Sequence, residues 1–268
     1  MTVPVLTASR TEREGAPTLV LGPSLGTTTR LWSAAIPLLA QHFDILAVDL
    51  PGHGASPAAT EPFSTGELAE AVARVAALAG VERFYYAGDS LGGQLALELA
   101  LRHPEKTIAV SIICSAAKVG EPAAWLERAA TVRAQGTPVL VGPSAGRWYA
   151  PGFIEKNPEL VGAMLIELSD TDDESYALCC EALAVCDLRS RLAEIDVPVL
   201  ALWGALDVVI PPADARTVAE GVRHGRGLEL AGVAHLAPAE SPTEVAEALI
   251  EFFSAAPEHG TASRREQS

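Results

Sequence analysis

The chain has 268 residues, a hydrophobic fraction of 49% and a formal net charge of −15. This length suits one large α/β domain, or one domain with an insertion. The acidic balance argues against nucleic-acid binding, which needs a basic face, and no apolar run reaches about 18 residues, so neither a membrane-spanning helix nor a membrane partner is expected.

Apolar, β-type segments recur along the chain with helical patterns between them. Several are near-continuous hydrophobic runs, which is typical of strands buried on both faces of a parallel sheet. The alternation predicts a doubly wound α/β fold, a mostly parallel central sheet with helices on both faces. The expected strands cover residues 18–22, 44–50, 83–88, 108–114, 197–204 and 227–232.

Two amphipathic helices are clear within this alternation. One covers residues 65–80 and ends at a glycine, and the other covers residues 241–255, with Ser241 as its expected N-cap and a proline at the next position.

The strand signal stops between residues 118 and 188. Helical patterns over residues 121–136 and 172–192 flank a Pro/Gly-rich segment, residues 137–159. We therefore expect a helical cap inserted into the α/β core, and a polar C-terminal tail that is disordered. The expected division is core 1–117, cap 118–188, core 189–256 and tail 257–268.

The cysteines are Cys114, Cys179, Cys180 and Cys186. They form no C-x-x-C pair, and no cysteine and histidine cluster has metal-ligand spacing, so no metal site is expected. The N-terminal segment MTVPVLTASRTEREG lacks the apolar core of a secretory signal. We interpret the thiols as reduced and mostly buried, in a cytoplasmic protein.

Ser90 stands at a sharp turn in the segment YYAGDSLGGQLALELALRH. A strand that turns directly into a helix crowds the turning residue against its neighbours two positions away, where only small side chains fit. Gly88 and Gly92 occupy those positions. This G-x-S-x-G pattern predicts a nucleophile elbow, with the hydroxyl above the sheet and a helix N-terminus behind it. A glycine-rich turn with a capping serine would show the same five residues, so the setting decides.

Three polar residues each follow an expected strand: Ser90, Asp207 and His235. Ligands of open parallel sheets bind at the carboxyl ends of the strands, and the order Ser, Asp, His is that of the α/β hydrolases. His235 would take the proton of Ser90 as general base and return one to the leaving group, while Asp207 fixes the imidazole tautomer. The sequence therefore predicts a catalytic triad that needs no cofactor.

Two further residues could compete for these roles. We expect His53, in DLPGHGAS, to shape the loop after the second expected strand. We place Asp214 on the helix that follows Asp207, facing away.

The attacked carbonyl would become an oxyanion, which preorganised backbone N–H groups stabilise. Leu91, directly after the nucleophile, is one expected donor. The other should come from the loop after the first expected strand, where we choose Leu25 because Pro23 has no N–H.

Beyond these residues the chain resembles the 3-oxoadipate enol-lactonases, which are α/β-hydrolase-fold enzymes. The resemblance runs from VLGPSLGTTTRLW to AHLAPAESP, nearly the whole chain. The triad and DLPGHGAS are generic to the superfamily. The more specific segments, which look like the characteristic cap segments of this group, are CSAAKVGEPAAWLERAATVRAQG, RWYAPGFIEKNPE and SYALCCEALAVCDLR.

The resemblance implies a substrate, the small anionic enol-lactone formed late in aromatic-acid catabolism. Because the protein is acidic, a local cation should receive the substrate carboxylate, and arginine pairs well with carboxylates. The cap offers Arg128, Arg133 and Arg147, although each could simply be solvated; we choose Arg133 because it shares an expected helix with Trp125. Trp148, in the Pro/Gly-rich segment, is expected to wall the pocket, unless it only packs the cap on the core.

Two other functions stay open. Another small-ester or lactone esterase, or a carbon–carbon bond hydrolase, would share the fold and triad. A non-catalytic ligand-binding protein on the same fold is the alternative of a different class. An epoxide hydrolase or dehalogenase is disfavoured because it needs a carboxylate where this chain has Ser90. The oligomeric state is left open.

Overall fold

A seven-stranded sheet forms the centre of the computed structural model, which describes residues 2–256. The strand order is β1-β3-β2-β4-β5-β6-β7. Strand β1 is antiparallel to β3, and every other neighbouring pair is parallel. The strands are β1 (Ala8–Thr11), β2 (Thr18–Gly22), β3 (Asp44–Val48), β4 (Phe84–Asp89), β5 (Thr107–Ile113), β6 (Val199–Gly204) and β7 (Gly225–Leu230).

The mostly parallel sheet and its six predicted parallel strands are confirmed, with ends that differ by one or two residues. Strands β2 to β6 are buried along their whole length, as their apolar runs indicate. Strand β1 was not predicted. It is a short, largely exposed edge strand of sequence ASRT, so it carries no apolar signal.

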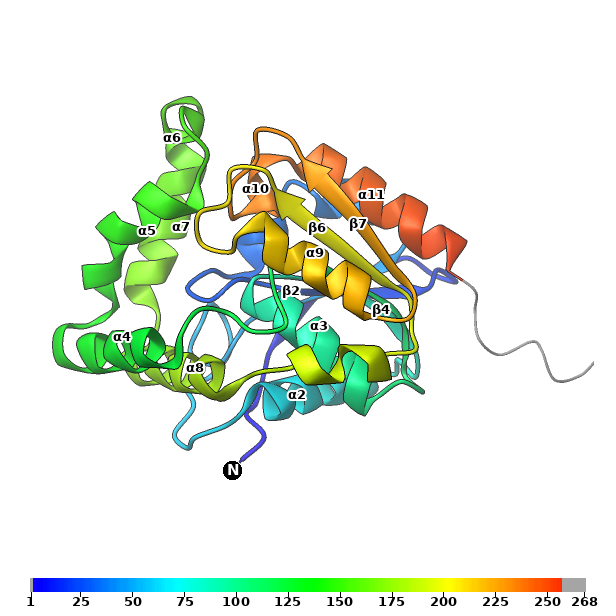
Figure 1. The fold of residues 1–268 in the computed structure, drawn as a ribbon, viewed down its shortest axis with the longest axis horizontal. Helices are drawn as coiled ribbons and strands as arrows, with labels where there is room; N and C mark the ends of the chain where they lie inside the picture. The colour runs from blue at the N-terminus through cyan, green and yellow to red at the C-terminus, as the bar shows by residue number, and fades with distance from the viewer. Residues whose placement is uncertain (1, 257–268) are drawn as a thin grey trace, which may run out of the picture.

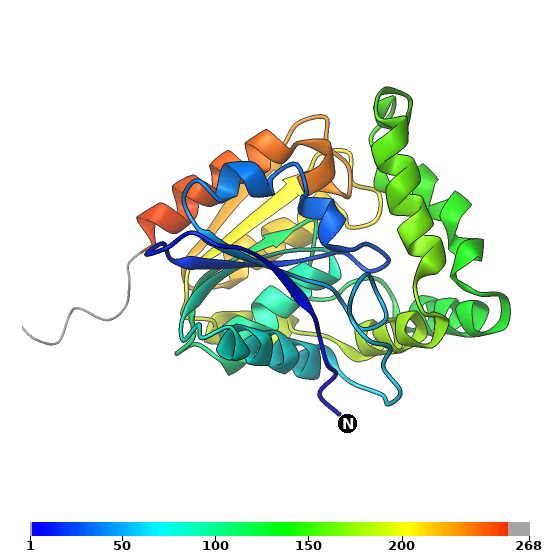
Figure 2. The same cartoon turned by 180° about the vertical axis from the view of Figure 1, so that it is seen from behind.

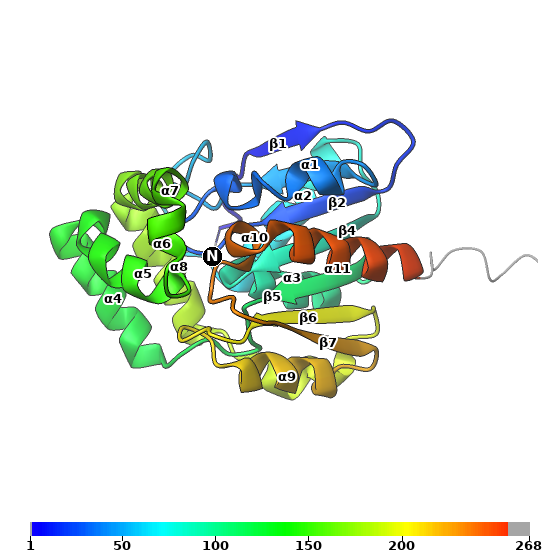
Figure 3. The same ribbon diagram turned by 90° about the horizontal axis from the view of Figure 1, so that it is seen from above.

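Helices cover both faces of the sheet (Figures 1 and 3). Helices α2 (Thr65–Leu78), α3 (Leu91–Arg102) and α9 (Pro212–Gly221) lie on one face, and α1 (Ile36–Leu39) and α11 (Pro242–Ala255) lie on the other. Figure 2 shows α1 beside α11 from behind. The core therefore has two apolar layers, one on each side of the strands.

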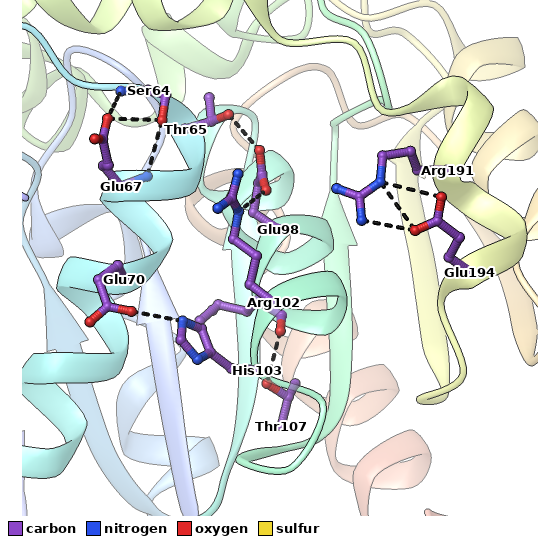
Figure 4. A network of polar contacts seen from close by, with 11 residues as sticks. Ser64, Thr65, Glu67, Glu70, Glu98, Arg102, His103, Thr107, Arg191 and Glu194 are labelled. Carbon is purple, nitrogen blue, oxygen red and sulfur yellow. Dashed lines mark hydrogen bonds and ion pairs between the residues drawn. The ribbon is translucent and has the colours of Figure 1, made fainter. Parts of the chain in front are cut away.

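A polar network ties α2 to α3 (Figure 4). At the start of α2, Ser64 and Glu67 bond each other's backbone N–H groups in a capping box. The buried carboxylate of Glu98, on α3, accepts hydrogen bonds from Thr65 Oγ1 at 2.9 Å and from Arg102 Nε at 2.7 Å. This network holds α3 beside α2, and α3 is the helix that starts directly after Ser90.

A set of helices lies beyond the carboxyl ends of the strands, where the arrowheads of β6 and β7 point in Figure 1. Helix α4 packs along α8, and α7 lies against the turn before α5. We call this set the cap. Its members are α4 (Pro122–Gln135), η2 (Thr137–Leu140), α5 (Val141–Trp148), α6 (Phe153–Lys156), α7 (Pro158–Asp170) and α8 (Asp173–Val185).

Three details differ from the sequence expectations. The Pro/Gly-rich segment is largely helical, because its prolines stand in the first turns of η2 and α7, where no N–H is needed. Helix α8 ends at Val185, and a separate 3₁₀ helix, η3 (Arg189–Glu194), follows. Ser241 stands at the N-cap of α11, but its hydroxyl donates to Glu244 Oε2 instead of capping the helix.

Two short helices complete the described chain, η1 (Thr29–Trp32) and α10 (Ala237–Glu240). No helix within residues 2–256 has the length and apolar character needed to span a membrane. The four cysteines are buried free thiols. The expected tail, residues 257–268, lies outside the described residues.

Candidate active site

Ser90 adopts a backbone conformation that side-chain-bearing residues rarely take, with φ 53° and ψ −112°. It lies between the last residue of β4 and the first residue of α3. Positive φ at a residue other than glycine is strained, and such strain persists only where the surroundings impose it. The turn that the G-x-S-x-G pattern predicts is therefore present in the structure.

The flanking glycines allow this turn. A Cβ atom on Gly88 would lie 2.2 Å from the backbone C and O of Gly92, and a Cβ on Gly92 would lie 2.8 Å from the carbonyl oxygens of Gly22 and Pro23. Both contacts are with backbone, which cannot move aside cheaply. Strand, turn and helix can thus come together only with glycine at both positions.

Hydrogen bonds to Ile113, the last residue of β5, and to Ser115, two residues further along the chain, hold the turn in place. The N–H of Ser90 donates to the carbonyl of Ile113 at 2.8 Å, and Ser115 Oγ donates to the carbonyl of Ser90 at 2.6 Å. Sequence reasoning missed the role of Ser115. Its signal was its place two residues after the neighbouring strand.

His235 and Asp207 form a buried pair. His235 Nδ1 lies 2.9 Å from Asp207 Oδ2, and both side chains are almost fully excluded from solvent. Asp207 Oδ1 accepts two more hydrogen bonds, from the N–H groups of Val209 at 2.7 Å and Ile210 at 3.0 Å. The carboxylate is thereby fixed in orientation, and it directs the Nε2 edge of the imidazole away from itself. Asp214 lies on α9 and is exposed.

Within the described residues, Ser90 Oγ forms no hydrogen bond with the imidazole. Catalytic hydrogen bonds are often long before substrate binds and shorten in the complex. Ser90 keeps 8% of its surface exposed, whereas His235 keeps 1%. Ser90 is therefore the most exposed residue of the predicted triad, since Asp207 keeps 5% of its surface exposed.

The two predicted oxyanion donors have free backbone N–H groups. Leu91 is the first residue of α3, where a helical N–H has no partner of its own. Leu25 lies in the loop after β2, and among the described residues neither Leu25 nor Leu91 donates its N–H to another atom. Free, preorganised N–H groups are what an oxyanion needs.

His53 holds the loop that carries Leu25. Its Nε2 accepts a hydrogen bond from the N–H of Gly26 at 3.0 Å, and its Nδ1 lies 2.8 Å from the carbonyl of Pro51, to which it donates. Complete burial lowers the pKa of His53 to about 4, so it is neutral at pH 7. The expectation that His53 shapes its own loop was thus too narrow, because it also positions the loop after β2.

The cap reaches the site through Trp148. The backbone carbonyl of Trp148 accepts hydrogen bonds from the N–H groups of His235 at 3.1 Å and Leu236 at 3.3 Å. Its ring packs against Gly26, since a Cβ on that glycine would lie 3.4 Å from it. Trp148 ends helix α5 and does not stand in a loop as expected, but the structure does bring it to the site.

Arg133 is not placed to receive a substrate. Its guanidinium bonds both oxygens of Glu174, at 2.8 and 2.7 Å, and forms a second ion pair with Glu181. Its fork of donors is therefore occupied by the cap's own carboxylates, which join α4 to α8. Sharing a helix with Trp125 was a poor criterion, because neighbours along a helix can point to different partners.

Asp89, directly before Ser90, is a carboxylate one residue away from the nucleophile position. It is completely buried, and neither carboxylate oxygen has a hydrogen-bond partner among the described residues. Burial, followed by the nearby charges of Asp207 and Glu240, raises its pKa well above the ordinary value. The carboxyl group beside the nucleophile therefore keeps its proton to higher pH than an ordinary aspartate does.

Within residues 2–256, no group of three or more histidine, cysteine, aspartate or glutamate side chains is placed to hold a metal ion.

Two variants of His53 test its two hydrogen bonds separately. In His53→Gln the side-chain oxygen can still accept from Gly26, whereas in His53→Asn the shorter amide can only reach Pro51. We expect His53→Asn to lose about tenfold or more in kcat with little change in KM, because loss of one oxyanion donor costs about 10²–10³-fold in other enzymes. His53→Gln should stay closer to wild type. Equal losses in two equally stable variants would contradict this role.

Asp89 should make stability depend on pH. The unfolded chain ionises this group near pH 4, while the folded chain keeps the proton to higher pH, so stability falls as pH rises through that interval. We expect the stability gain of Asp89→Asn over wild type to grow as the pH rises above about 4, by at most about 1.4 kcal/mol per pH unit. Urea unfolding measures this, with the exposed Asp214→Asn as control for the lost charge. A difference that does not change with pH would contradict a raised pKa of Asp89.

Comparisons with known proteins agree with this geometry. A family model described as the alpha/beta hydrolase fold matches residues 17–242. The chain is 35% identical to 3-oxoadipate enol-lactonase 2 of Acinetobacter baylyi, over 84% of each chain, and 31% identical to 3-oxoadipate enol-lactonase 1 of the same organism, over 90% of this chain and 88% of that one. A crystal structure of the enol-lactonase from Burkholderia xenovorans LB400 superposes with a TM-score of 0.90 at 29% identity, covering 93% of this chain and 96% of that chain. The chain therefore belongs to the α/β hydrolase fold family.

Proposed function

We propose that this protein hydrolyses 3-oxoadipate enol-lactone to 3-oxoadipate, a step in the catabolism of aromatic compounds. It is an ester or lactone hydrolase by its family and relatives. One observation carries the catalytic part of the proposal: a buried, hydrogen-bonded His235–Asp207 pair together with a strained Ser90 at the start of α3. The choice of lactone is supported by the relatives named enol-lactonases.

In the first half of the proposed reaction, Ser90 Oγ attacks the lactone carbonyl carbon while His235 Nε2 takes the hydroxyl proton. The N–H groups of Leu25 and Leu91 bind the oxyanion. The ring C–O bond then breaks, and His235 returns the proton to the enol oxygen that leaves. The enol tautomerises to a ketone, which leaves an open-chain acyl group esterified to Ser90.

In the second half, a water molecule attacks the acyl-enzyme. His235 takes a proton from the water, and the same backbone donors bind the second oxyanion. Collapse of this intermediate breaks the ester bond, returns the proton to Ser90 Oγ and releases 3-oxoadipate. Throughout, Asp207 holds the imidazole in the tautomer that accepts at Nε2 and stabilises the imidazolium.

Removal of the hydroxyl tests this assignment. We expect Ser90→Ala to reduce kcat on 3-oxoadipate enol-lactone by about 10⁴-fold or more, because members of such triads act as a unit. The loss of lactone absorbance, followed with purified protein, gives the rate. The exposed Ser254 on α11 provides the control, and Ser254→Ala should keep the wild-type rate.

The same assay separates the rival functions. Comparable rates for Ser90→Ala and wild type would remove Ser90 as nucleophile. A wild-type protein that hydrolyses 4-nitrophenyl acetate but leaves the enol-lactone untouched would be an esterase of another specificity. Binding of the lactone without turnover would indicate a non-catalytic binding protein.

A further inference from the structure

A small cavity of about 130 Å³ lies between the cap and the core. Trp125 and Arg128 contribute to it from α4, Arg147 contributes from α5, and Val209 contributes from the loop after β6. One carboxylate also lines it, that of Glu121, and this group is ion-paired with Lys118 Nζ at 3.0 Å. The cavity thus combines apolar side chains with two guanidinium groups. The carboxylate of Glu121 is paired with Lys118 and does not neutralise them.

Arginines without an ion pair are uncommon in this acidic chain. Most arginines within residues 2–256 bind an aspartate or glutamate, as Arg10, Arg102 and Arg133 do. The described exceptions are Arg13, Arg83, Arg128 and Arg147.

The four exceptions lie in two places. Arg13 and Arg83 line a hollow at the amino ends of the strands, which also contains the carboxylates of Glu12, Glu14 and Asp44. Arg128, which is half-buried, and Arg147, which is exposed, line the cavity between the cap and the core. Two unpaired guanidinium groups at one small cavity, in a protein of net charge −15, are suited to an anion supplied from outside.

The walls of this cavity connect directly to the catalytic residues. The N–H of Val209 donates to Asp207, and Arg147 immediately precedes Trp148, whose carbonyl holds His235.

Arg128 connects the cavity to the oxyanion loop. Its Nη1 lies 3.5 Å from the hydroxyl of Tyr176. The ring of Tyr176 stacks on His53 at 6.2 Å and packs against Gly26, next to Leu25. Each cationic wall of the cavity is therefore one or two contacts away from a group that acts on the scissile carbonyl.

The geometry favours a carboxylate as the ligand. The Arg128 guanidinium lies 5.2 Å from the ring centre of Trp125, and this cation–π contact limits the orientations of its donor fork. A fork held in this way matches the two oxygens of a carboxylate. Trp125 and Val209 provide apolar surface for the carbon atoms beside it.

We propose that Arg128 and Arg147, in the cavity with Trp125 and Val209, bind the carboxylate of the anionic substrate. This assignment rests on the proposed function for the identity of the substrate, and it replaces Arg133 as the expected receptor. The carboxylate arm would lie under the cap while the lactone carbonyl lies between Ser90 and the N–H groups of Leu25 and Leu91.

The test compares Arg128→Gln, Arg147→Gln and the double variant with Arg83→Gln, which removes an unpaired arginine that does not line the cavity. Each cavity variant should raise KM for the enol-lactone by about tenfold, because a hydrogen bond to a charged group is lost. In the double variant, the ratio of kcat/KM for the enol-lactone to kcat/KM for uncharged 4-nitrophenyl acetate should fall about 100-fold. Arg83→Gln should leave this ratio at the wild-type value.

A binding measurement keeps the two proposals apart. Calorimetric titration with adipate, a dicarboxylate that is not turned over, should show binding to wild type and to Arg83→Gln, and loss of binding in the double variant. If wild type binds adipate through these arginines but does not hydrolyse the enol-lactone, the proposed function fails and the carboxylate site stands. Absence of adipate binding to wild type, or an unchanged specificity ratio in a folded double variant, would overturn the site.

Discussion

The strained backbone at Ser90 is the constraint on which the rest of the site depends. With φ 53°, the residue is stable only because Gly88 and Gly92 let strand, turn and helix approach, and because Ile113 and Ser115 hold its two peptide groups. This turn raises the hydroxyl above the sheet and places the N–H of Leu91 beside it. A relaxed turn would bury the hydroxyl or direct that N–H elsewhere, so strain and reactivity have one structural origin.

Segments distant in sequence are assembled around this turn by hydrogen bonds between loops. His53 joins the loop after β3 to the loop after β2, and Asp49 strengthens the same junction by accepting from the N–H of Thr29 at 2.7 Å. The carbonyl of Trp148 then joins the cap to the loop that carries His235. The cap is therefore part of the site's framework, because Trp148 of α5 holds the backbone of the loop that carries the imidazole. A shift of the cap would be expected to change the position of His235 as well as access to it.

The features of the fold and the site that could be predicted from the sequence are those that depend on local residue patterns. Buried parallel strands read as apolar runs, and the spacing of glycines around Ser90 follows from backbone contact alone. The placement of Ser90, Asp207 and His235 after strands could be predicted because the strands themselves are recognisable as apolar runs. Side-chain partnerships across the fold were not predictable: Arg133 and Arg128 stand on one helix, yet Arg133 is bound by Glu174 and Glu181 from α8, while Arg128 has no ion pair. The short strand β1 was missed because an exposed edge needs no apolar residues.

In the proposed mechanism the imidazole of His235 activates the hydroxyl of Ser90, and covalent labelling can show whether it does. A fluorophosphonate reacts with an activated serine, and peptide mapping by mass spectrometry locates the adduct. We expect a single adduct on the peptide that contains Ser90, formed rapidly in wild type and at least about 10³-fold more slowly in a folded His235→Gln variant. An adduct on another serine, or equal labelling rates in the two proteins, would contradict it.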